Sequence, residues 1–258
     1  MRIFCIGDIV GEPGINILSE KLEYFKKDEH INLIIANAEN SCHGRGITRS
    51  VYDRLSDMGI DGFTMGNHVW NCKDIFPLMQ YRENIIRPAN FENGCPGRGS
   101  MILNCNGVLV GVINLAGRVF MDPVNSPFYA VTGQINYLNS KGVKIILVDF
   151  HAEATSEKQA MGWYLDGKVS AVFGTHTHVQ TADECILTQG TGYITDLGMT
   201  GPVYSILGMK RSLVIDKFLT GIPTRFEVED GKAKICGCIF DIDEETVKTV
   251  SISRINIQ

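Results

Sequence analysis

The chain has 258 residues, of which 44% are hydrophobic and 21% are charged. These proportions are ordinary for a soluble globular protein, and the length allows one large domain or two small ones. The formal net charge is −5, so a surface that binds nucleic acid tightly and without sequence preference is not expected.

The sequence predicts a cytoplasmic protein. The apolar stretch at the N-terminus is short and is followed at once by an acid, and no later apolar run is long enough for a membrane span. The eight cysteines are irregularly spaced, which argues against a disulfide framework in a chain of this size. Cys5, Cys105 and Cys185 lie in apolar runs and are expected in the core. Cys236 and Cys238 would share one strand face; a two-ligand metal site is conceivable there, but buried core thiols are favoured.

Apolar runs alternate with amphipathic stretches in the first part of the chain. In order, the predicted elements are a strand at 2–7, a helix at 15–27, a strand at 32–37, a helix at 50–58, a strand at 61–66 and a short helix at 72–79. The first helix places four apolar side chains on one face, namely Ile15, Leu18, Leu22 and Phe25. Gly59 is expected to end the second helix, and Pro77 to interrupt the third.

The pattern changes after residue 90. Two strands within 100–115 are joined by Asn106-Gly107, which is typical of a hairpin turn. The next predicted elements are a helix at 128–140, a strand at 143–150, a helix at 157–165 and a strand at 170–174. Ser156 with Gln159 would cap the helix at 157–165. The remainder is strand-like at 185–196, 225–243 and 249–257, with one helix at 211–221. With no repeat and no linker, we expect a single domain over 1–258: an α/β sandwich of two mixed sheets with helices outside.

Polar or ionisable side chains follow five of the buried strands. They are Asp8, then Glu39 with Asn40, then Asn67 with His68, then His151, and finally His176 with His178. Ligands of α/β proteins bind at the carboxyl ends of the strands. Taken singly, most of these residues are more simply turn, cap or core residues. Glu39 is the exception, because a carboxylate close to a core is costly without a partner. The shared placement of all of them favours a functional site.

The residue types at these strand ends indicate metal ions. His176 and His178 are two apart, and alternate residues of an extended chain point the same way. Oxygen and imidazole ligands without thiolate suit Mn²⁺, Fe or Zn²⁺ better than a structural cysteine zinc site. Without His68, the strand ends offer seven such groups, and seven with one bridging carboxylate are about what the two-metal clamp of phosphatases and nucleases needs.

Several motifs carry a family resemblance. "GNH" after a strand, a later histidine after "LVDF", and "GTHTH" resemble the calcineurin-like metallophosphoesterase superfamily. More closely, "GDIVGEPG", "NAEN", "GRGIT", "GNHVW", "DFHAEATSEK", "GTHTHVQTAD" and "TDLGMTGP" resemble the bacterial YmdB-type phosphodiesterase family over nearly the whole chain. The resemblance implies an α-β-β-α sandwich. Asp8 lacks the Asp-x-His pattern of most superfamily members, Glu39 replaces the bridging Asp, and Val69 replaces the acid after Gly-Asn-His, all in agreement with the YmdB-like subgroup.

The resemblance also implies a role for each residue. One metal would be held by Asp8, Glu39 and His178, and the second by Glu39, Asn40, Asn67, His151 and His176, with Glu39 bridging. Fe or Mn is expected, with Zn or Mg as alternatives, and a metal-bound hydroxide would attack phosphorus. His68 would donate a proton to the leaving oxygen. The alternative for His68 is a structural residue hydrogen-bonded to a ligand carboxylate.

The predicted substrate is a small phosphodiester, most simply a cyclic nucleotide such as 2′,3′-cyclic or 3′,5′-cyclic AMP. Arg45 and Arg118 are candidate phosphate contacts, although such arginines are often plain surface residues. Two alternatives remain open: a phosphomonoesterase or nuclease that uses the same metals, and a regulatory protein that binds RNA or protein and keeps a vestigial metal site. The family resemblance suggests self-association, and no membrane partner is expected.

Overall fold

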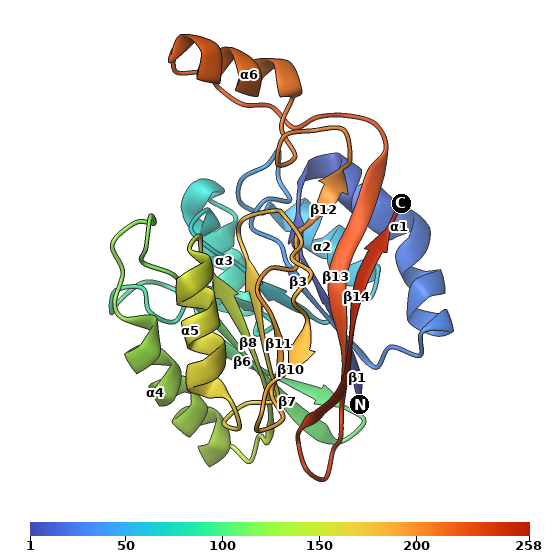
Figure 1. Ribbon diagram of the computed structural model, residues 1–258, viewed down its shortest axis with the longest axis vertical. Helices are drawn as coiled ribbons and strands as arrows, with labels where there is room; N and C mark the ends of the chain where they lie inside the picture. The colour runs from blue at the N-terminus through green and yellow to red at the C-terminus, as the bar shows by residue number, and fades with distance from the viewer.

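Two mixed β-sheets packed face to face form the centre of the computed structural model, which describes residues 1–258 (Figure 1). The first sheet has the strand order β2-β12-β13-β1-β3-β4-β5, with β14 paired to β13. Its strands are β1 (Arg2–Ile6), β2 (Asp8–Ile9), β3 (Leu33–Asn37), β4 (Gly62–Thr64), β5 (Ile85–Ile86), β12 (Met199–Pro202), β13 (Ala233–Ile242) and β14 (Thr249–Ile257). The run from β1 through β3 and β4 to β5 is parallel.

The second sheet has the order β10-β11-β9-β8-β7-β6. Its strands are β6 (Ser100–Cys105), β7 (Val108–Ala116), β8 (Ile145–His151), β9 (Ala171–Thr175), β10 (Cys185–Ile186) and β11 (Gly192–Ile194). The four inner strands are parallel, and an antiparallel strand closes each edge. Asn106 and Gly107 both have positive φ, at 52° and 90°, as a two-residue hairpin turn between β6 and β7 requires.

Alternating side chains on the strands build the layers. In β1, Ile3 and Cys5 belong to the core between the two sheets, whereas Phe4 and Ile6 pack with the helices on the outer face. The inner core continues into the second sheet, and the outer faces of β7 and β8 pack under two other helices. Because the inner strands β1, β3, β8 and β9 are covered on both faces, they are buried almost throughout and are continuous apolar runs in the sequence. The predicted α-β-β-α sandwich is confirmed.

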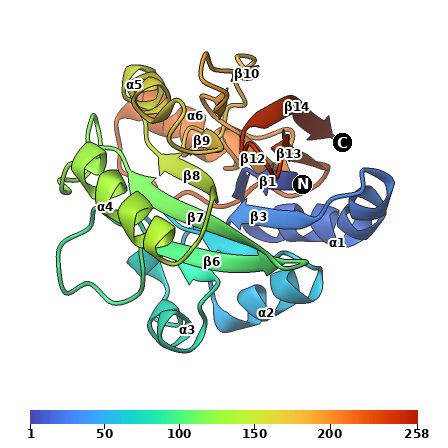
Figure 2. The same ribbon diagram turned by 90° about the horizontal axis from the view of Figure 1, so that it is seen from below.

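The helices are α1 (Gly11–Asp28), α2 (Arg49–Asp57), α3 (Ile75–Tyr81), α4 (Pro127–Ser140), α5 (Thr155–Leu165) and α6 (Arg211–Thr220), with a 3₁₀ turn, η1, at Val69–Asn71. In both ribbon views α4 and α5 lie on one side of the sandwich and α1 on the other (Figures 1 and 2). Figure 1 also shows α6 standing apart from the sheets, and Val214 is its one buried residue. No helix is both long and apolar enough to cross a bilayer.

Most predicted elements are present, with several local corrections. Ile15, Leu18, Leu22 and Phe25 are all buried on α1, as expected. Pro77 does not interrupt α3, because it lies in the first turn, where no intrahelical N–H is needed. Ser156 does not cap α5: the helix already begins at Thr155 and has no side-chain cap. Cys185 is exposed, since β10 is a two-residue strand at the sheet edge.

The parallel runs determine where the polar residues gather. β1, β3 and β4 end at one edge of the first sheet, and β8 and β9 end at one edge of the second. Gly174 in β9 lets the segment that follows β11 pass close to β9 at this edge of the second sheet, because a Cβ at position 174 would collide with the backbone oxygen of Thr195.

Replacing Gly174 by Ala should therefore destabilise the metal-free protein by about 1–3 kcal/mol, the usual cost of overpacking. Gly133→Ala is the matched control. It lies within α4 with nothing near its Cβ position, so the change should stabilise the protein by about 0.5–1 kcal/mol. Urea unfolding measures both, and equal stability of the two variants would contradict the close approach at Gly174.

Candidate metal centre

The polar residues predicted at the strand ends converge at one edge of the sandwich. Asp8 opens β2 directly after β1, Glu39 and Asn40 follow β3, and Asn67 follows β4. His151 is the last residue of β8, and His176 and His178 follow β9. Glu39, Asn40, His68, His176 and His178 line a cleft of about 1100 Å³.

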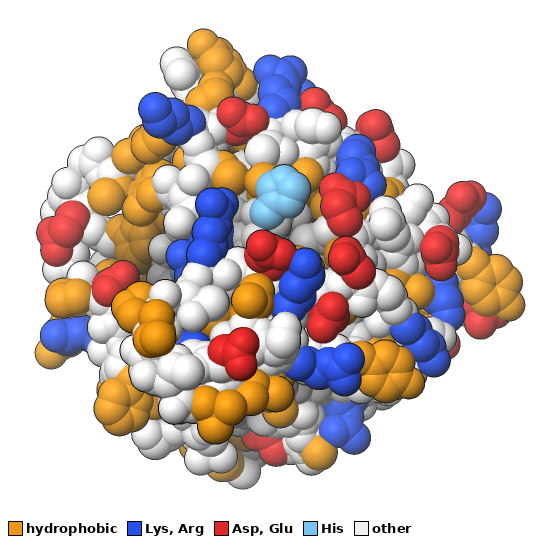
Figure 3. Space-filling model, turned by 90° about the horizontal axis from the view of Figure 1, so that it is seen from above, with side chains coloured by type: hydrophobic (Ala, Val, Ile, Leu, Met, Phe, Trp, Pro, Cys, Tyr) orange, Lys and Arg blue, Asp and Glu red, His pale blue; other side chains and the backbone are white.

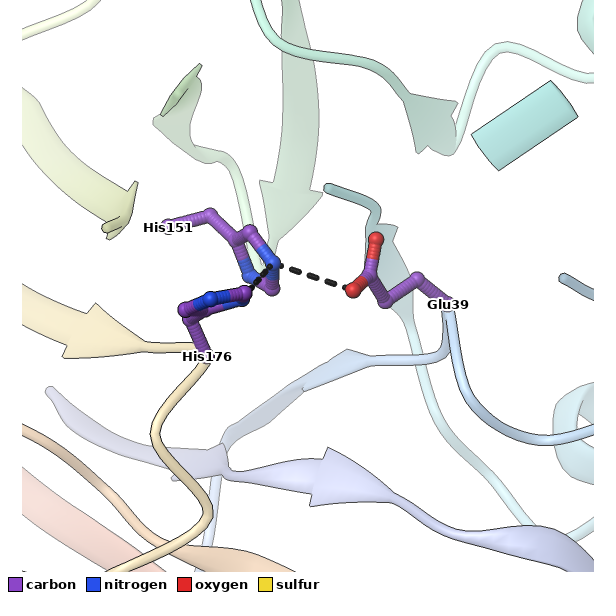
Figure 4. A group of neighbouring side chains, drawn as sticks. All are labelled: Glu39, His151 and His176. Atoms are coloured by element: carbon purple, nitrogen blue, oxygen red, sulfur yellow. Dashed lines mark hydrogen bonds and ion pairs between the residues drawn. The ribbon is translucent and has the colours of Figure 1, made fainter. Parts of the chain in front are cut away.

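The Nε2 atom of His151 is the meeting point of three other side chains. It lies 3.0 Å from Glu39 Oε1, 3.0 Å from Asn67 Oδ1 and 3.0 Å from His176 Nδ1. Figure 4 shows the His151 ring between the carboxylate and the second imidazole. A single proton cannot serve three acceptors at once. One ligand atom each from Glu39, His151 and His176 lies within 4.8 Å of the others, so these residues form a cluster able to hold a metal ion.

Each of the three histidines is also bound through its second nitrogen. His151 Nδ1 is 2.9 Å from Thr175 Oγ1, and Thr175 donates its only hydroxyl hydrogen to Asp149 Oδ1 at 2.7 Å. Thr175 must therefore accept from His151, which places a hydrogen on Nδ1. His176 Nε2 lies 3.3 Å from Glu153, and His178 Nδ1 lies 2.9 Å from the Leu207 carbonyl. Oxygen partners of this kind fix the tautomer and orientation of metal-binding histidines.

A second group of polar atoms lies beside the first. His178 Nε2 is 3.8 Å from Asp8 Oδ1, and Asp8 Oδ2 accepts the backbone N–H of His176 at 3.1 Å. Asp8 Oδ1 and Asn40 Oδ1 are buried and have no hydrogen-bond partner. Two orphaned oxygen acceptors cost free energy in a neutral environment. Because both atoms can only accept, a cation suits them, and the donor set fits a metal.

The charges of the cluster are strongly coupled. Burial opposes ionisation of Glu39, but His151 and His68 outweigh it and lower the Glu39 pKa to about 2. Burial also opposes protonation of His151, yet Glu39, Asp8 and Asp149 raise its pKa to about 9. Burial and the charge on His151 lower the pKa of His176 to about 3. Without a metal, one proton is therefore held on His151, and His176 stays neutral.

Buried groups behind the cluster hold it in place. Asp149 in β8 accepts hydrogen bonds from Thr175 and Thr64, and Asn37 Nδ2 lies 3.4 Å from its Oδ2. Burial raises the pKa of Asp149 to about 6. The sequence offers one signal for this residue, an acid inside the apolar run 143–150, which the pattern predicts only as strand. Gly66 leaves room for the cluster, because a Cβ there would collide with His151 Nε2 and approach Glu39 Oε2 at 2.5 Å.

The loop of the two later histidines differs from its predicted form. β9 ends at Thr175, and His176 and His178 have positive φ values of 103° and 64°. The argument from an extended chain is therefore wrong. The turns separate the two rings, so that His176 reaches His151 and His178 reaches Asp8.

Asp196 anchors the loop that carries His176 and His178. It accepts hydrogen bonds from the Thr177 N–H and hydroxyl and pairs with Lys158 at 2.6 Å. Both members of the ion pair are about 1% exposed. Lys158 lies on α5 and gave no signal in the sequence, because an isolated lysine in an amphipathic helix is typical of a surface position.

The remaining candidate residues take different positions. The His68 ring lines the cleft, and the bond from this residue to Glu39 comes from its backbone N–H, at 2.9 Å. His68 is thus hydrogen-bonded to a ligand carboxylate, as the structural alternative has it, but through its backbone and not through its ring. Arg45 is exposed and lines the cleft. Arg118 is exposed and lines neither this cleft nor the smaller cavity beside it, so the structure does not bring it to the cluster.

Comparison with known proteins identifies the family. Residues 4–255 match the model of the YmdB-like protein family. The chain belongs to the YmdB-like family. A curated relative from Bacillus subtilis (strain 168), a 2′,3′-cyclic-nucleotide 2′-phosphodiesterase, is 49% identical over 257 residues, which are 100% of this chain and 97% of the relative. The predicted family is thus confirmed, and the enzyme class predicted with it agrees with that relative's name.

Solved structures support the fold. A YmdB-like chain should match its relatives along the whole sandwich, and a crystal structure of a novel phosphatase from Mycoplasma pneumoniae matches with a TM-score of 0.94 and 34% identity, covering 100% of this chain and 93% of that one. A hypothetical protein from Thermus thermophilus matches at 0.92 and 39% identity, over 99% and 98% of the two chains. A 5′-nucleotidase precursor from the same organism, 11% identical with a TM-score of 0.58 over 100% of this chain and 54% of that one, shares the fold alone.

The buried Lys158–Asp196 pair leads to a stability prediction. Lys158→Met removes the cation and leaves a buried carboxylate unpaired, so the free energy of unfolding should fall by about 3–5 kcal/mol. Lys144→Met, at an exposed position, should change it by no more than about 0.5 kcal/mol. Urea unfolding of both metal-free variants gives the comparison. A Lys158→Met loss as small as that of the control would show that the pair does not anchor the loop.

Proposed function

We propose that this chain is a metal-dependent phosphodiesterase that hydrolyses small cyclic nucleotides, with 2′,3′-cyclic mononucleotides as its preferred substrates. The observation that carries the proposal is the arrangement of the three histidines. Each has one ring nitrogen bound to an oxygen and the other directed at carboxylate, amide or imidazole groups. The name of the Bacillus subtilis relative supports the choice of substrate.

The donor atoms divide into two sets that share Glu39. Asp8, Glu39 and His178 would hold one ion, and Glu39, Asn40, Asn67, His151 and His176 the other. Fe or Mn fits this mixture of hard oxygens and imidazoles, with Zn or Mg as alternatives. When bound, such ions supply Lewis acidity towards phosphate oxygens and activate water at neutral pH. The orphaned oxygens of Asp8 and Asn40 support the assignment of both residues.

His68 is proposed as the proton donor. Its backbone is fixed by the bond to Glu39, while its ring lines the cleft without a hydrogen bond to the protein. An imidazole nitrogen in this position can give a proton to the leaving alkoxide as the phosphorus–oxygen bond breaks. Arg45, on the cleft wall, is proposed to bind a phosphate oxygen.

The cleft's charge favours a small substrate over a long polyanion. Besides Glu39, the cleft is lined by four acidic residues, Glu12, Glu153, Glu227 and Asp230, so its acids outnumber its two arginines, Arg45 and Arg225. Figure 3 shows acidic and basic side chains intermixed over this end of the molecule, without a continuous basic stripe. A nuclease groove needs such a stripe.

Glu39→Gln tests both the metal and the activity. The change keeps the shape of the side chain but removes the negative charge shared by both donor sets. Losing a residue that only hydrogen-bonds to a metal ligand lowers metal affinity about 10–100-fold, and the loss of Glu39, itself a proposed ligand, should lower it further. Two measurements belong together. One is the metal content after loading with Mn²⁺ or Fe²⁺, and the other is the hydrolysis of 2′,3′-cyclic AMP, bis-p-nitrophenyl phosphate and p-nitrophenyl phosphate. Glu23→Gln, an exposed control, should retain both. Failure of the metal-loaded wild type to hydrolyse any diester would refute the proposal, and a preference for p-nitrophenyl phosphate would make it a monoesterase.

His68→Gln separates proton donation from metal binding. The kcat for 2′,3′-cyclic AMP should fall about 10²–10⁴-fold, because its leaving alkoxide needs a proton. Hydrolysis of bis-p-nitrophenyl phosphate should fall much less, since p-nitrophenolate leaves unaided. Metal content should match that of wild type and of His30→Gln, a distant exposed control. An equal loss on both substrates would contradict the donor role.

A further inference from the structure

A second cavity of about 230 Å³ lies beside the metal cluster, and Asn67 is the one residue of its lining that has a role in the chemistry described above. It is separate from the large cleft, and the segment 67–72 runs between the two: His68, Asn71 and Cys72 line the cleft, whereas Asn67 and Trp70 line the second cavity. The volume is below the about 300–1,000 Å³ of pockets for drug-sized ligands. It therefore suits a single ring system rather than a whole nucleotide.

The walls of this cavity are flat and apolar. Trp70 and Phe91 line it with ring centroids 6.1 Å apart, and Trp70 is backed by Phe76 in a stacked pair at 5.7 Å. Met121, Pro123 and Val124 also line it. Aromatic side chains that line a cavity in this way are the surfaces on which nucleobases stack.

The polar groups at the cavity select what can bind. Glu92 and Asp122 line it and are exposed. Ionised carboxylates only accept hydrogen bonds and repel phosphate. The cavity therefore favours a planar ring that carries an exocyclic amino group as donor, and it disfavours a second phosphate group.

Buried hydrogen bonds hold both walls in place. The Asn90 side chain, 1% exposed, donates to the carbonyls of Ala116 and Asn125 and accepts from the Ala116 N–H, each at 2.8 Å. Arg87 donates to the carbonyls of Pro88, Cys95 and Pro96. The Asn90 bonds tie the loop after β5 to the end of β7 and the loop after it, and the Arg87 bonds hold the loop after β5 itself, so the cavity is formed before any ligand arrives.

One residue joins the cavity to the metal cluster. Asn67 lines the cavity, and its Oδ1 lies 3.0 Å from His151 Nε2. We propose that this cavity is the nucleobase subsite of the phosphodiester substrate, with Trp70 stacking on the base and Glu92 or Asp122 accepting from its amino group. This inference rests on the proposed function. It assigns adenine, guanine and cytosine nucleotides as better substrates than uracil nucleotides.

Kinetics with and without a base test the subsite. Trp70→Ala should raise the KM for 2′,3′-cyclic AMP about tenfold to a hundredfold, and leave hydrolysis of 1-O-methylribose 2′,3′-cyclic phosphate unchanged, with wild-type metal content. Trp70→Phe should recover most of the loss because it keeps an aromatic face. Equal losses on the two substrates would mean a structural role, and no loss on either would mean that the base binds elsewhere. Both results overturn the proposal.

Fluorescence gives a test that does not need hydrolysis. The chain has two tryptophans, and Trp163 on α5 is 59% exposed and lines neither cavity. In Trp163→Phe the emission comes from Trp70 alone, and adenosine should quench it saturably while ribose 5-phosphate does not. Absence of quenching overturns the subsite. Quenching in a protein that hydrolyses no phosphodiester would leave the subsite standing and remove the proposed function instead.

Discussion

The hydrogen-bond chain from Asp149 through Thr175 to His151 sets the chemistry of the whole centre. Thr175 gives its only hydrogen to Asp149 and so must accept from His151 Nδ1. That choice leaves Nε2 facing Glu39, Asn67 and His176. If the ring were free to turn, these three groups, which come from three different strand ends, would have no common partner. All three side chains, Asp149, Thr175 and His151, are fully buried, so water cannot compete for their hydrogen bonds.

The balance of buried charge explains why the centre suits cations. Asp8, Glu39, Asp149 and Asp196 are all 1% exposed or less. Buried carboxylates are costly unless they are paired, and only Asp196 has a permanently charged partner, Lys158. The other three carboxylates have only the positive charge of protonated His151 to compensate them, and burial still raises the pKa of both Asp8 and Asp149. The fold tolerates this excess of negative charge at one sheet edge, which is the condition that a divalent ion relieves.

The sequence predicted the layers of the fold well, because a sandwich covered on both sides gives long apolar strands whose ends are marked by polar residues. It also predicted that the residues at the strand ends meet, since parallel strands must end at the same edge, whereas Arg118 lies away from them. It could not predict how they meet. An extended-chain rule puts His176 and His178 side by side, but positive φ values turn the loop. Lys158 and Asp196 became visible only with the fold, because 38 residues separate them in the sequence.

The stretch Asn67-His68-Val69-Trp70-Asn71 shows how a short turn can serve several purposes. Around the 3₁₀ turn η1, residues three apart lie on the same side. Asn67 and Trp70 therefore line the small cavity, His68 and Asn71 line the large cleft, and Val69 is fully buried in the core. An acid at position 69 would have to be buried among apolar side chains here. Val69 instead anchors the turn. One short segment thereby fixes the amide of Asn67 beside the metal cluster, the imidazole of His68 in the large cleft and the indole of Trp70 in the small cavity.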